Sequence, residues 1–363
     1  MIDNTFALPS YPCQSDMWEE LKNESRPIVV YGMGNGADKL FERLALIGVS
    51  VSDIFASDGF VRGHYFRGMR VKSFSEIKEA YSDFVILLSF ASNRSEVLEM
   101  LSQIDAEYDM YIPDMPVSGD EYFDKDFYNT HYEQILCAIS SLSDEESRRK
   151  FASIVNFKLF GRMKFLEKCT DTKDEIYAAL PCSEIVTYLD VGAYNGDTVR
   201  EAKQYFSSLK RAVAIEPDPK TYKRLLRYAE GEEEIELLTV NAAALDKDGE
   251  GSFLTGGNRN SSVNSTASFK HQSNLISYVT VDSLGEAPDF IKYDVEGAEL
   301  AALEGSRQTI SDHRPALLIS LYHRSEDIFA LINYMKQNYP FYRMCLKRVR
   351  CVPAWEIDLI LTT

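Results

Sequence analysis

Short apolar runs alternate with amphipathic segments in the first third of the chain. IVVY (28–31) is a β-branched apolar run that leads into a glycine-rich turn, and DKLFERLALIG (38–48) then spaces its apolar residues as a helix does. A further apolar run covers 84–90, followed by an amphipathic segment over 92–104. This alternation predicts a parallel sheet with right-handed crossovers, so residues 1–116 are expected to form a small Rossmann-like domain.

The pattern changes between residues 117 and 180, where the strand signals stop. Polar, helix-forming sequence such as SDEESRRKFASIVNFKLFGRMKFLEK takes its place and predicts a helical connector. This connector is a candidate for packing over the next domain and for contacts in a homodimer, and the pattern favours neither.

A second alternating series occupies residues 181–363. Its expected elements are strand 185–191, helix 197–206, strand 211–217, helix 219–230, strands 235–240, 290–294 and 315–321, helix 326–338, and strands 341–349 and 356–362. Segments 251–254 and 275–281 predict an inserted hairpin, joined by the polar stretch TGGNRNSSVNST. The fold class expected is therefore α/β, with two Rossmann-like parallel sheets, the second closed by a terminal antiparallel hairpin.

Composition narrows the possible partners. The 363 residues are 45% hydrophobic and 26% charged, as in ordinary soluble proteins, and the formal net charge of -17 disfavours binding to nucleic acid. The six cysteines show no C-x-x-C spacing, which argues against a disulfide framework or a cysteine metal site. No apolar run is long enough to span a membrane, and the first residues lack the pattern of a signal peptide. We expect a cytoplasmic protein that does not associate with membranes.

The sequence YLDVGAYNGDT (188–198) is the main candidate binding motif. An apolar strand ends near Asp190, and Gly192 and Gly196 flank a tight turn before a helix. Glycine lets the backbone approach a ligand closely, and the free N–H groups of the helix N-terminus suit a carboxylate. A plain strand–turn–helix joint is the alternative interpretation.

Two further elements follow along the chain. AIEPD places Glu216 at the end of the next strand, where a carboxylate can accept hydrogen bonds from both hydroxyls of a ribose. VNAAAL follows the third strand, and its small residues leave room for an adenine ring. Asn241 in this segment either contacts the base or caps the turn.

IKYDVEGAEL (291–300) brings charged residues to the carboxyl edge of the sheet, where open α/β folds bind their ligands. Asp294 and Glu296 are candidate catalytic residues there, whereas Glu299 is explained by the dipole of the helix that it begins. His323 follows the next strand on the same edge and has a suitable ordinary pKa to take a proton from a hydroxyl. A structural histidine is the alternative.

Together with TVDSL (280–284), these motifs resemble the FkbM family of methyltransferases over about 188–323. The resemblance implies a class I methyltransferase fold that uses S-adenosylmethionine, and members mostly methylate hydroxyl oxygens of sugars, glycans or natural products. It assigns to the cofactor the residues Asp190, Gly192, Asn195 and Gly196 around the methionine part and Glu216 on the ribose. Asn241 and Ala242, from the segment after the third strand, are the candidates near the adenine. Tyr194 departs from the small or polar residue usual before Asn195.

The function expected is S-adenosylmethionine-dependent methylation of a hydroxyl on a small-molecule or glycan acceptor. His323, Asp294 and Glu296 are the expected catalytic residues, because removal of one proton is the main chemical help that the reaction needs. Nothing in the sequence requires a metal ion.

The N-terminal domain carries a fingerprint of its own. GMGNGA follows the first strand with Gly32 and Gly34. VSVSDIFASD (49–58) predicts the second strand, which ends at Asp58 in a ribose-binding position. This makes a nucleotide site in residues 1–116 a candidate. Two other functions are kept open: a nucleotide-sugar or NAD-dependent oxidoreductase that uses this domain, and a non-catalytic cofactor-binding scaffold.

Overall fold

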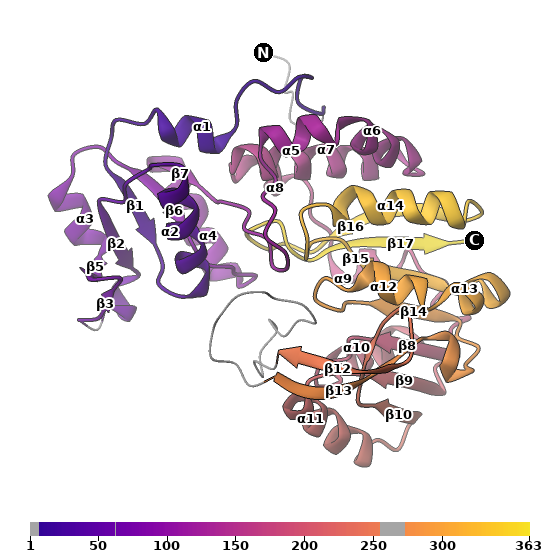
Figure 1. Ribbon diagram of the computed structural model, residues 1–363. Helices are drawn as coiled ribbons and strands as arrows, with labels where there is room; N and C mark the ends of the chain where they lie inside the picture. Colours follow the sequence, from indigo (N-terminus) through magenta and orange to yellow (C-terminus); the bar gives the residue numbers. More distant parts are fainter. Residues whose placement is uncertain (1–6, 62, 255–272) are drawn as a thin grey trace.

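The structure is a computed structural model that describes residues 7–61, 63–254 and 273–363. Two sheets lie apart from one another, with a group of helices along one side of the molecule (Figure 1). The polar stretch between the strands of the inserted hairpin lies outside the described residues.

The N-terminal sheet has the strand order β5-β2-β1-β6-β7, and all its pairings are parallel. In chain order its strands are β1 (Ile28–Tyr31), β2 (Asp53–Ala56), β5 (Lys72–Ser73), β6 (Val85–Leu88) and β7 (Asp109–Tyr111). Its helices are α1 (Met17–Lys22), α2 (Asn35–Leu46), α3 (Phe74–Ala80) and α4 (Ser95–Glu107), and a small ribbon joins β3 (Tyr65–Phe66) to β4 (Met69–Arg70). The Rossmann-like sheet expected here is confirmed, and β1 and β6 are its fully buried centre.

Helices α5 (Lys125–Thr130), α6 (Tyr132–Ser141), α7 (Glu145–Phe160), α8 (Lys164–Glu167) and α9 (Lys173–Tyr177) follow. Helix α7 begins where the Asp144 carboxylate accepts the Ser147 N–H and ends at Gly161, whose φ of +60° is the left-handed conformation that favours glycine. Most of α7 is buried, including Phe151 and Phe157. It packs against strand β16, so this helix belongs to the core.

The C-terminal sheet has the order β10-β9-β8-β14-β15-β17-β16, parallel except where β17 runs antiparallel to both of its neighbours. Its strands are β8 (Thr187–Val191), β9 (Arg211–Ile215), β10 (Glu236–Val240), β14 (Phe290–Tyr293), β15 (Ala316–Ser320), β16 (Arg343–Arg348) and β17 (Ile357–Thr362). Its helices are α10 (Asp197–Tyr205), α11 (Pro219–Glu230), α12 (Glu299–Glu304), α13 (Arg307–His313) and α14 (Asp327–Asn338). A small sheet is formed by β11 (Ala242–Ala244), β13 (Ser273–Val279) and β12 (Gly249–Leu254). The predicted second parallel sheet with its terminal antiparallel hairpin is confirmed.

The two sheets share one apolar core. A single cluster of buried side chains extends from Tyr31 and Phe55 through Phe157 of α7 to Leu189 and Leu317 of the C-terminal sheet. A bridge also joins the halves, because Ser92 and Val352 exchange backbone hydrogen bonds of 2.8 and 3.0 Å. The N-terminal domain is therefore attached directly to the terminal hairpin.

Candidate functional site

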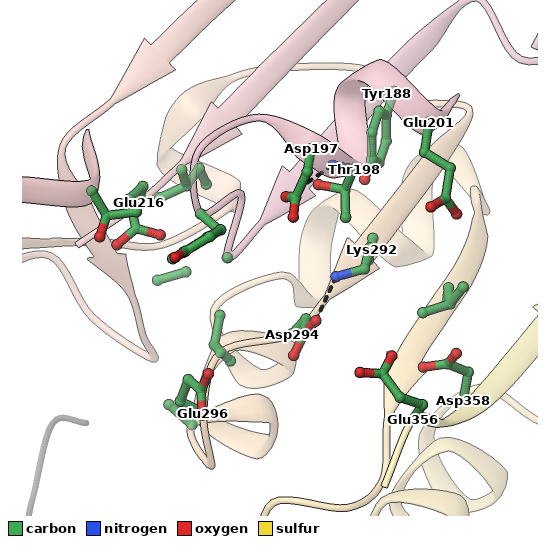
Figure 2. A pocket seen from close by; sticks show the side chains of 18 of the residues that line it. Tyr188, Asp197, Thr198, Glu201, Glu216, Lys292, Asp294, Glu296, Glu356 and Asp358 are labelled. Carbon is green, nitrogen blue, oxygen red and sulfur yellow. Dashed lines mark hydrogen bonds and ion pairs between the residues drawn. The ribbon is translucent and has the colours of Figure 1, made fainter. Parts of the chain in front are cut away.

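A cavity of about 340 Å³ lies at the carboxyl edge of the C-terminal sheet, where β8 and β14 are neighbours and the strand order reverses. Figure 2 shows Glu216 on one side of this cavity and Lys292, Glu356 and Asp358 on the other. Its charged lining side chains are Asp197, Glu201, Glu216, Asp218, Asp294, Glu296, Glu356 and Asp358, with Lys173 and Lys292. The cavity is therefore strongly acidic.

The turn after β8 lies tightly against the end of β14. A Cβ added to Gly192, whose φ is +97°, would lie 1.9 Å from the carbonyl oxygen of Asp294. The N–H groups of Gly192 and Ala193 both donate to the Ile215 carbonyl, at 3.0 and 2.9 Å. Glycine is needed here because two strand ends and the cavity meet at this point.

Asp190 is fully buried beside this turn, and burial raises its pKa. One oxygen, Oδ2, accepts a hydrogen bond from the Thr198 hydroxyl, but Oδ1 has no hydrogen-bond partner among the described residues. Asn195 lies apart from the cavity, where its side-chain oxygen accepts from Arg200 at 3.3 Å. Gly196, with a φ of +81°, packs against Tyr228. Of these four predicted residues, Gly192 lines the cavity, whereas Asp190, Asn195 and Gly196 lie outside its lining.

Glu216 lines the cavity with only 7% of its surface exposed. Burial raises its pKa to about 8, even though Oε1 accepts the Asp218 N–H at 2.7 Å. Asn241 donates its side-chain amide to the Glu216 carbonyl at 2.8 Å, so this residue fastens the turn after β9. Ala242 is buried in the cavity wall, where its small side chain leaves room for a ring.

The buried Glu216 predicts a pH-dependent stability. The folded chain holds this proton up to a pH of about 8, whereas the unfolded chain releases it near the ordinary value of 4.5. The folded state therefore binds more protons between these values, and the free energy of unfolding should fall as pH rises through them. We expect the difference between the melting temperatures, Glu216→Gln minus wild type, to increase as the pH rises from about 5 to about 9. Parallel curves of melting temperature against pH would contradict the assignment.

Asp294 and Glu296 line the cavity beside Lys292, whose Nζ donates to Asp294 Oδ2 at 2.7 Å. The turn that carries them is held from behind by Glu299, whose Oε1 accepts the Val295 N–H at 2.9 Å. Burial is nearly complete for Glu299, at 1% exposure. This residue was expected only to favour the start of a helix, and its hydrogen bonds show that it also shapes the turn.

His323 lies next to this turn, with the expected neighbours Asp294 and Glu296. Its Nδ1 is 2.8 Å from Glu299 Oε1, and its Nε2 is 3.5 Å from Asp294 Oδ1 and 3.7 Å from Glu296 Oε2. Burial lowers the pKa of His323, but the carboxylates of Glu299, Glu296 and Asp294 outweigh this effect and raise it to about 10. The side chain is 1% exposed and lies outside the cavity lining, so the three predicted catalytic residues meet, with the histidine behind the two carboxylates.

Backbone strain is concentrated at the same place. The described residues contain five non-glycine residues with positive φ, and three of them, Tyr194, Glu296 and Glu356, line the cavity. Such conformations cost energy and occur preferentially at functional sites. Glu296 has a φ of +55° and Tyr194 one of +48°, so both sides of the Gly192 contact are strained.

Several lining residues come from parts of the chain that sequence reasoning did not include. Asn93 belongs to the N-terminal domain, Tyr177 to the connector, and Glu356 and Asp358 to the terminal hairpin. Burial and the nearby Glu356 raise the pKa of Asp358 to about 7. The one available signal was Asp358 itself, an acidic residue inside the apolar run EIDLILT.

Close packing explains two of the glycines in the N-terminal GMGNGA motif. A Cβ at Gly32 would lie 2.7 Å from the Ser89 hydroxyl, and one at Gly36 would lie 2.2 Å from the Ser89 carbonyl oxygen. Gly34 has open space around it. Asp58 lines a separate hollow of about 290 Å³, and neither Gly32 nor Gly34 belongs to the lining of that hollow. The structure therefore does not gather the three predicted nucleotide-binding residues around one cavity.

Within the described residues, no group of three or more histidine, cysteine, aspartate or glutamate side chains is arranged to hold a metal ion. No helix in the same part of the chain has the length and apolar character needed to cross a bilayer.

The chain is similar to known proteins both in the sequence of its C-terminal half and in its overall fold. Residues 190–341 match the family model described as the methyltransferase FkbM domain. The fold is similar to the crystal structure of methyltransferase FkbM from Methylobacillus flagellatus KT, with a TM-score of 0.68 and 20% identity over 99% of this chain and 96% of that one. That similarity includes the N-terminal sheet and the connector.

Other resemblances are weaker. The precorrin-6y C5,15-methyltransferase from Geobacter metallireducens GS-15 has a TM-score of 0.33 and 11% identity, over 53% of this chain and 88% of its own. Aeropyrum pernix fibrillarin in complex with S-adenosyl-L-methionine has a TM-score of 0.33 and 12% identity, over 50% and 69%. These two scores are too low to support an argument. No curated protein matches the chain.

Proposed function

Because residues 190–341 form a methyltransferase domain of the FkbM family, we propose that this enzyme transfers a methyl group from S-adenosylmethionine to a hydroxyl oxygen of a sugar, a glycan or another small molecule. The observation that carries the proposal is the placement of Gly192 and Glu216 in the lining of an acidic cavity at the carboxyl edge of the sheet. S-adenosylmethionine supplies a methyl group activated by a positively charged sulfur.

The residues present fit this cofactor. Asp190 is buried beside the Gly192 turn, behind the cavity lining, and its Oδ1 lacks a hydrogen-bond partner among the described residues; we assign this carboxyl group to the ammonium group of the cofactor, since a buried carboxylate oxygen without a donor is costly. Glu216 suits the ribose hydroxyls, and the buried strand Ala242–Ala244 suits the adenine ring. The start of α10 borders the cavity at Asp197 and Thr198, and the N-terminus of a helix favours a carboxylate.

The acidic lining also restricts the acceptor. Carboxylates accept hydrogen bonds from hydroxyl groups, so a neutral polyhydroxyl compound can be held by several of them. A phosphate or carboxylate group would be repelled by the same side chains. We therefore propose an uncharged or cationic hydroxyl acceptor, in the part of the cavity formed by Glu201, Glu356 and Asp358.

The acceptor must lose its hydroxyl proton during the reaction. A hydroxyl oxygen that is gaining a methyl group becomes strongly acidic, so a carboxylate of ordinary basicity is sufficient to take the proton. Asp294 and Glu296 lie at the cavity wall near the Gly192 turn and are the exposed acceptors for it. The cavity also positions the acceptor, which can contribute more to the rate than the base does.

Glu216→Ala should weaken binding of S-adenosylhomocysteine to the full chain by about 1–3 kcal/mol, because the ribose hydroxyls would lose their hydrogen bonds to this buried carboxyl group. Titration calorimetry measures this effect. Glu233→Ala is the matched control, because Glu233 is exposed and lies outside the cavity. Equal affinity of the two variants would remove Glu216 from the ribose site, and no binding by the wild type would refute the cofactor.

The transfer itself is tested by offering the full chain S-adenosylmethionine with a library of neutral, amino and phosphorylated sugars. Mass spectrometry should detect a methylated product from the first two groups and none from the third. Binding of the cofactor without methylation of any acceptor would instead favour the non-catalytic scaffold.

A further inference from the structure

His323 is surrounded by acidic side chains from three elements. Glu299 at the start of α12 lies 2.8 Å from Nδ1, and Asp294 and Glu296, from the turn after β14, lie 3.5 and 3.7 Å from Nε2. Asp327, in the first turn of α14, is a fourth neighbouring acidic group, and burial raises its pKa to about 8. The Tyr322 ring covers the imidazole at 4.2 Å between centroids.

We propose that His323 is a permanently charged imidazolium that positions the Asp294 and Glu296 carboxylates, and that one of these carboxylates, instead of the imidazole, takes the proton of the acceptor. Only the second part of this inference, the transfer of the acceptor's proton to a carboxylate, rests on the proposed methyl transfer. The charge and position of His323 can be tested without any acceptor.

The contacts favour an imidazolium over a neutral imidazole. A neutral ring has one N–H and one lone pair, so one of its nitrogens would direct a lone pair at a carboxylate. The protonated ring places its positive charge within ion-pair distance of Glu299 on one side and of the Asp294–Glu296 pair on the other. With 1% of its side chain exposed, His323 also lies outside the cavity lining and is not placed to reach a hydroxyl there.

The cations around the turn support the same arrangement. Lys292 Nζ is 2.7 Å from Asp294 Oδ2, so the two oxygens of Asp294 face different positive groups. Arg324 donates its Nε to the Gly297 carbonyl at 2.7 Å and its backbone N–H to Asp327 at 2.8 Å. If His323 lost its charge, Glu299, Asp294 and Glu296 would repel one another across a buried space, and the strained turn at Glu296 would lose its support.

The proton and electron movements balance in this scheme. The acceptor oxygen forms a bond to the methyl carbon while the carbon–sulfur bond breaks and leaves its electron pair on sulfur. The hydroxyl proton passes to a carboxylate oxygen of Asp294 or Glu296, and it is then released to water when the product leaves. His323 keeps both of its protons throughout, which defines it as a positioning residue.

Nuclear magnetic resonance of the full chain with isotopically labelled histidine tests the charge directly. We expect the His323 ring to remain protonated through neutral pH and to titrate near a pKa of about 10. The signal is identified by its loss in His323→Gln or, if that variant does not fold, by the lowered midpoint in Glu299→Gln. A midpoint between about pH 5 and about pH 8, the range of an ordinary histidine, would overturn the inference.

The pH dependence of turnover tests the positioning. We expect His323→Gln to lower kcat about 10-fold at every pH between about 6 and about 9, with unchanged affinity for S-adenosylhomocysteine and an unchanged shape of the profile. A histidine base would behave differently, because its rising limb between pH 5 and 8 would disappear in the variant, together with about 10²–10⁴ of the rate. The second pattern would overturn the inference even if methyl transfer is confirmed. Absence of any turnover in the wild type would count against the proposed function and leave the titration result standing.

Discussion

Replacing both wall carboxylates, as Asp294→Asn with Glu296→Gln, is expected to lower kcat by about 10²–10⁴-fold, the usual cost of losing a general base. Both side chains line the cavity, whereas the neighbouring Glu299 and His323 are buried behind them. The amides keep the size of the carboxylates but cannot accept a proton. The affinity for S-adenosylhomocysteine should change much less than kcat, since the ribose and ammonium groups are assigned to other residues.

The two single variants then divide the effect. Whichever carboxylate takes the proton should reproduce most of the loss on its own, and the other should have a smaller effect through hydrogen bonding to the acceptor. Asp312→Asn with Glu233→Gln is the matched control, because both residues are exposed and distant from the cavity lining. A double variant that keeps its turnover within a few-fold of the wild type would mean that neither carboxylate is the base.

Gly192→Ala is expected to raise the dissociation constant for S-adenosylhomocysteine by about 100-fold or more, which corresponds to about 3 kcal/mol. The added methyl group would lie 1.9 Å from the Asp294 carbonyl oxygen, and the φ of +97° is unfavourable for alanine. Because the obstacle is backbone, it cannot move aside as a flexible side chain can. The end of β14 must shift, and this displaces Asp294 and the turn at Glu296 together.

Gly231→Ala provides the comparison for this substitution. Gly231 follows α11 with a φ of -99°, and the nearest atoms to an added Cβ lie 3.7 and 3.8 Å away, which is ordinary contact. Its affinity should stay near that of the wild type. Near-normal binding by Gly192→Ala would show that the strand end yields easily and that the turn is not part of the cofactor site.

Most strands and helices could be predicted because apolar residues recur along them at the spacing typical of each element, and because turn and capping residues mark their ends. Helix α11 occupies Pro219–Glu230 as expected, since Asp218 caps it and proline suits its first position. Asp190, Gly192 and Glu216 were identifiable for a related reason, because each occurs at the end of a parallel strand, and these ends meet at one edge.

The residues that were missed depend on packing between distant segments. Glu299 reads as a first-turn glutamate, and only its burial beside His323 shows that it braces a turn. Asn195 belongs to the same motif as Gly192, but the motif does not determine which way its side chain points. In the folded chain its side-chain oxygen accepts a hydrogen bond from Arg200. The charge state of His323 was equally hidden, because it follows from three carboxylates that approach only in the folded chain.

The bridge between Ser92 and Val352 sets Asn93 in the wall of a cavity whose other lining residues come from the connector and the C-terminal domain. The proposed reaction thus takes place at the strand ends of the C-terminal sheet. The shape of the cavity also depends on the loop that carries Asn93, about two hundred positions before Asp294. Changes in that loop can reshape the space for an acceptor without touching the base or the cofactor. Selection for a new acceptor could therefore act on the first domain alone, and a hybrid enzyme could inherit its substrate preference from one parent and its reaction from the other.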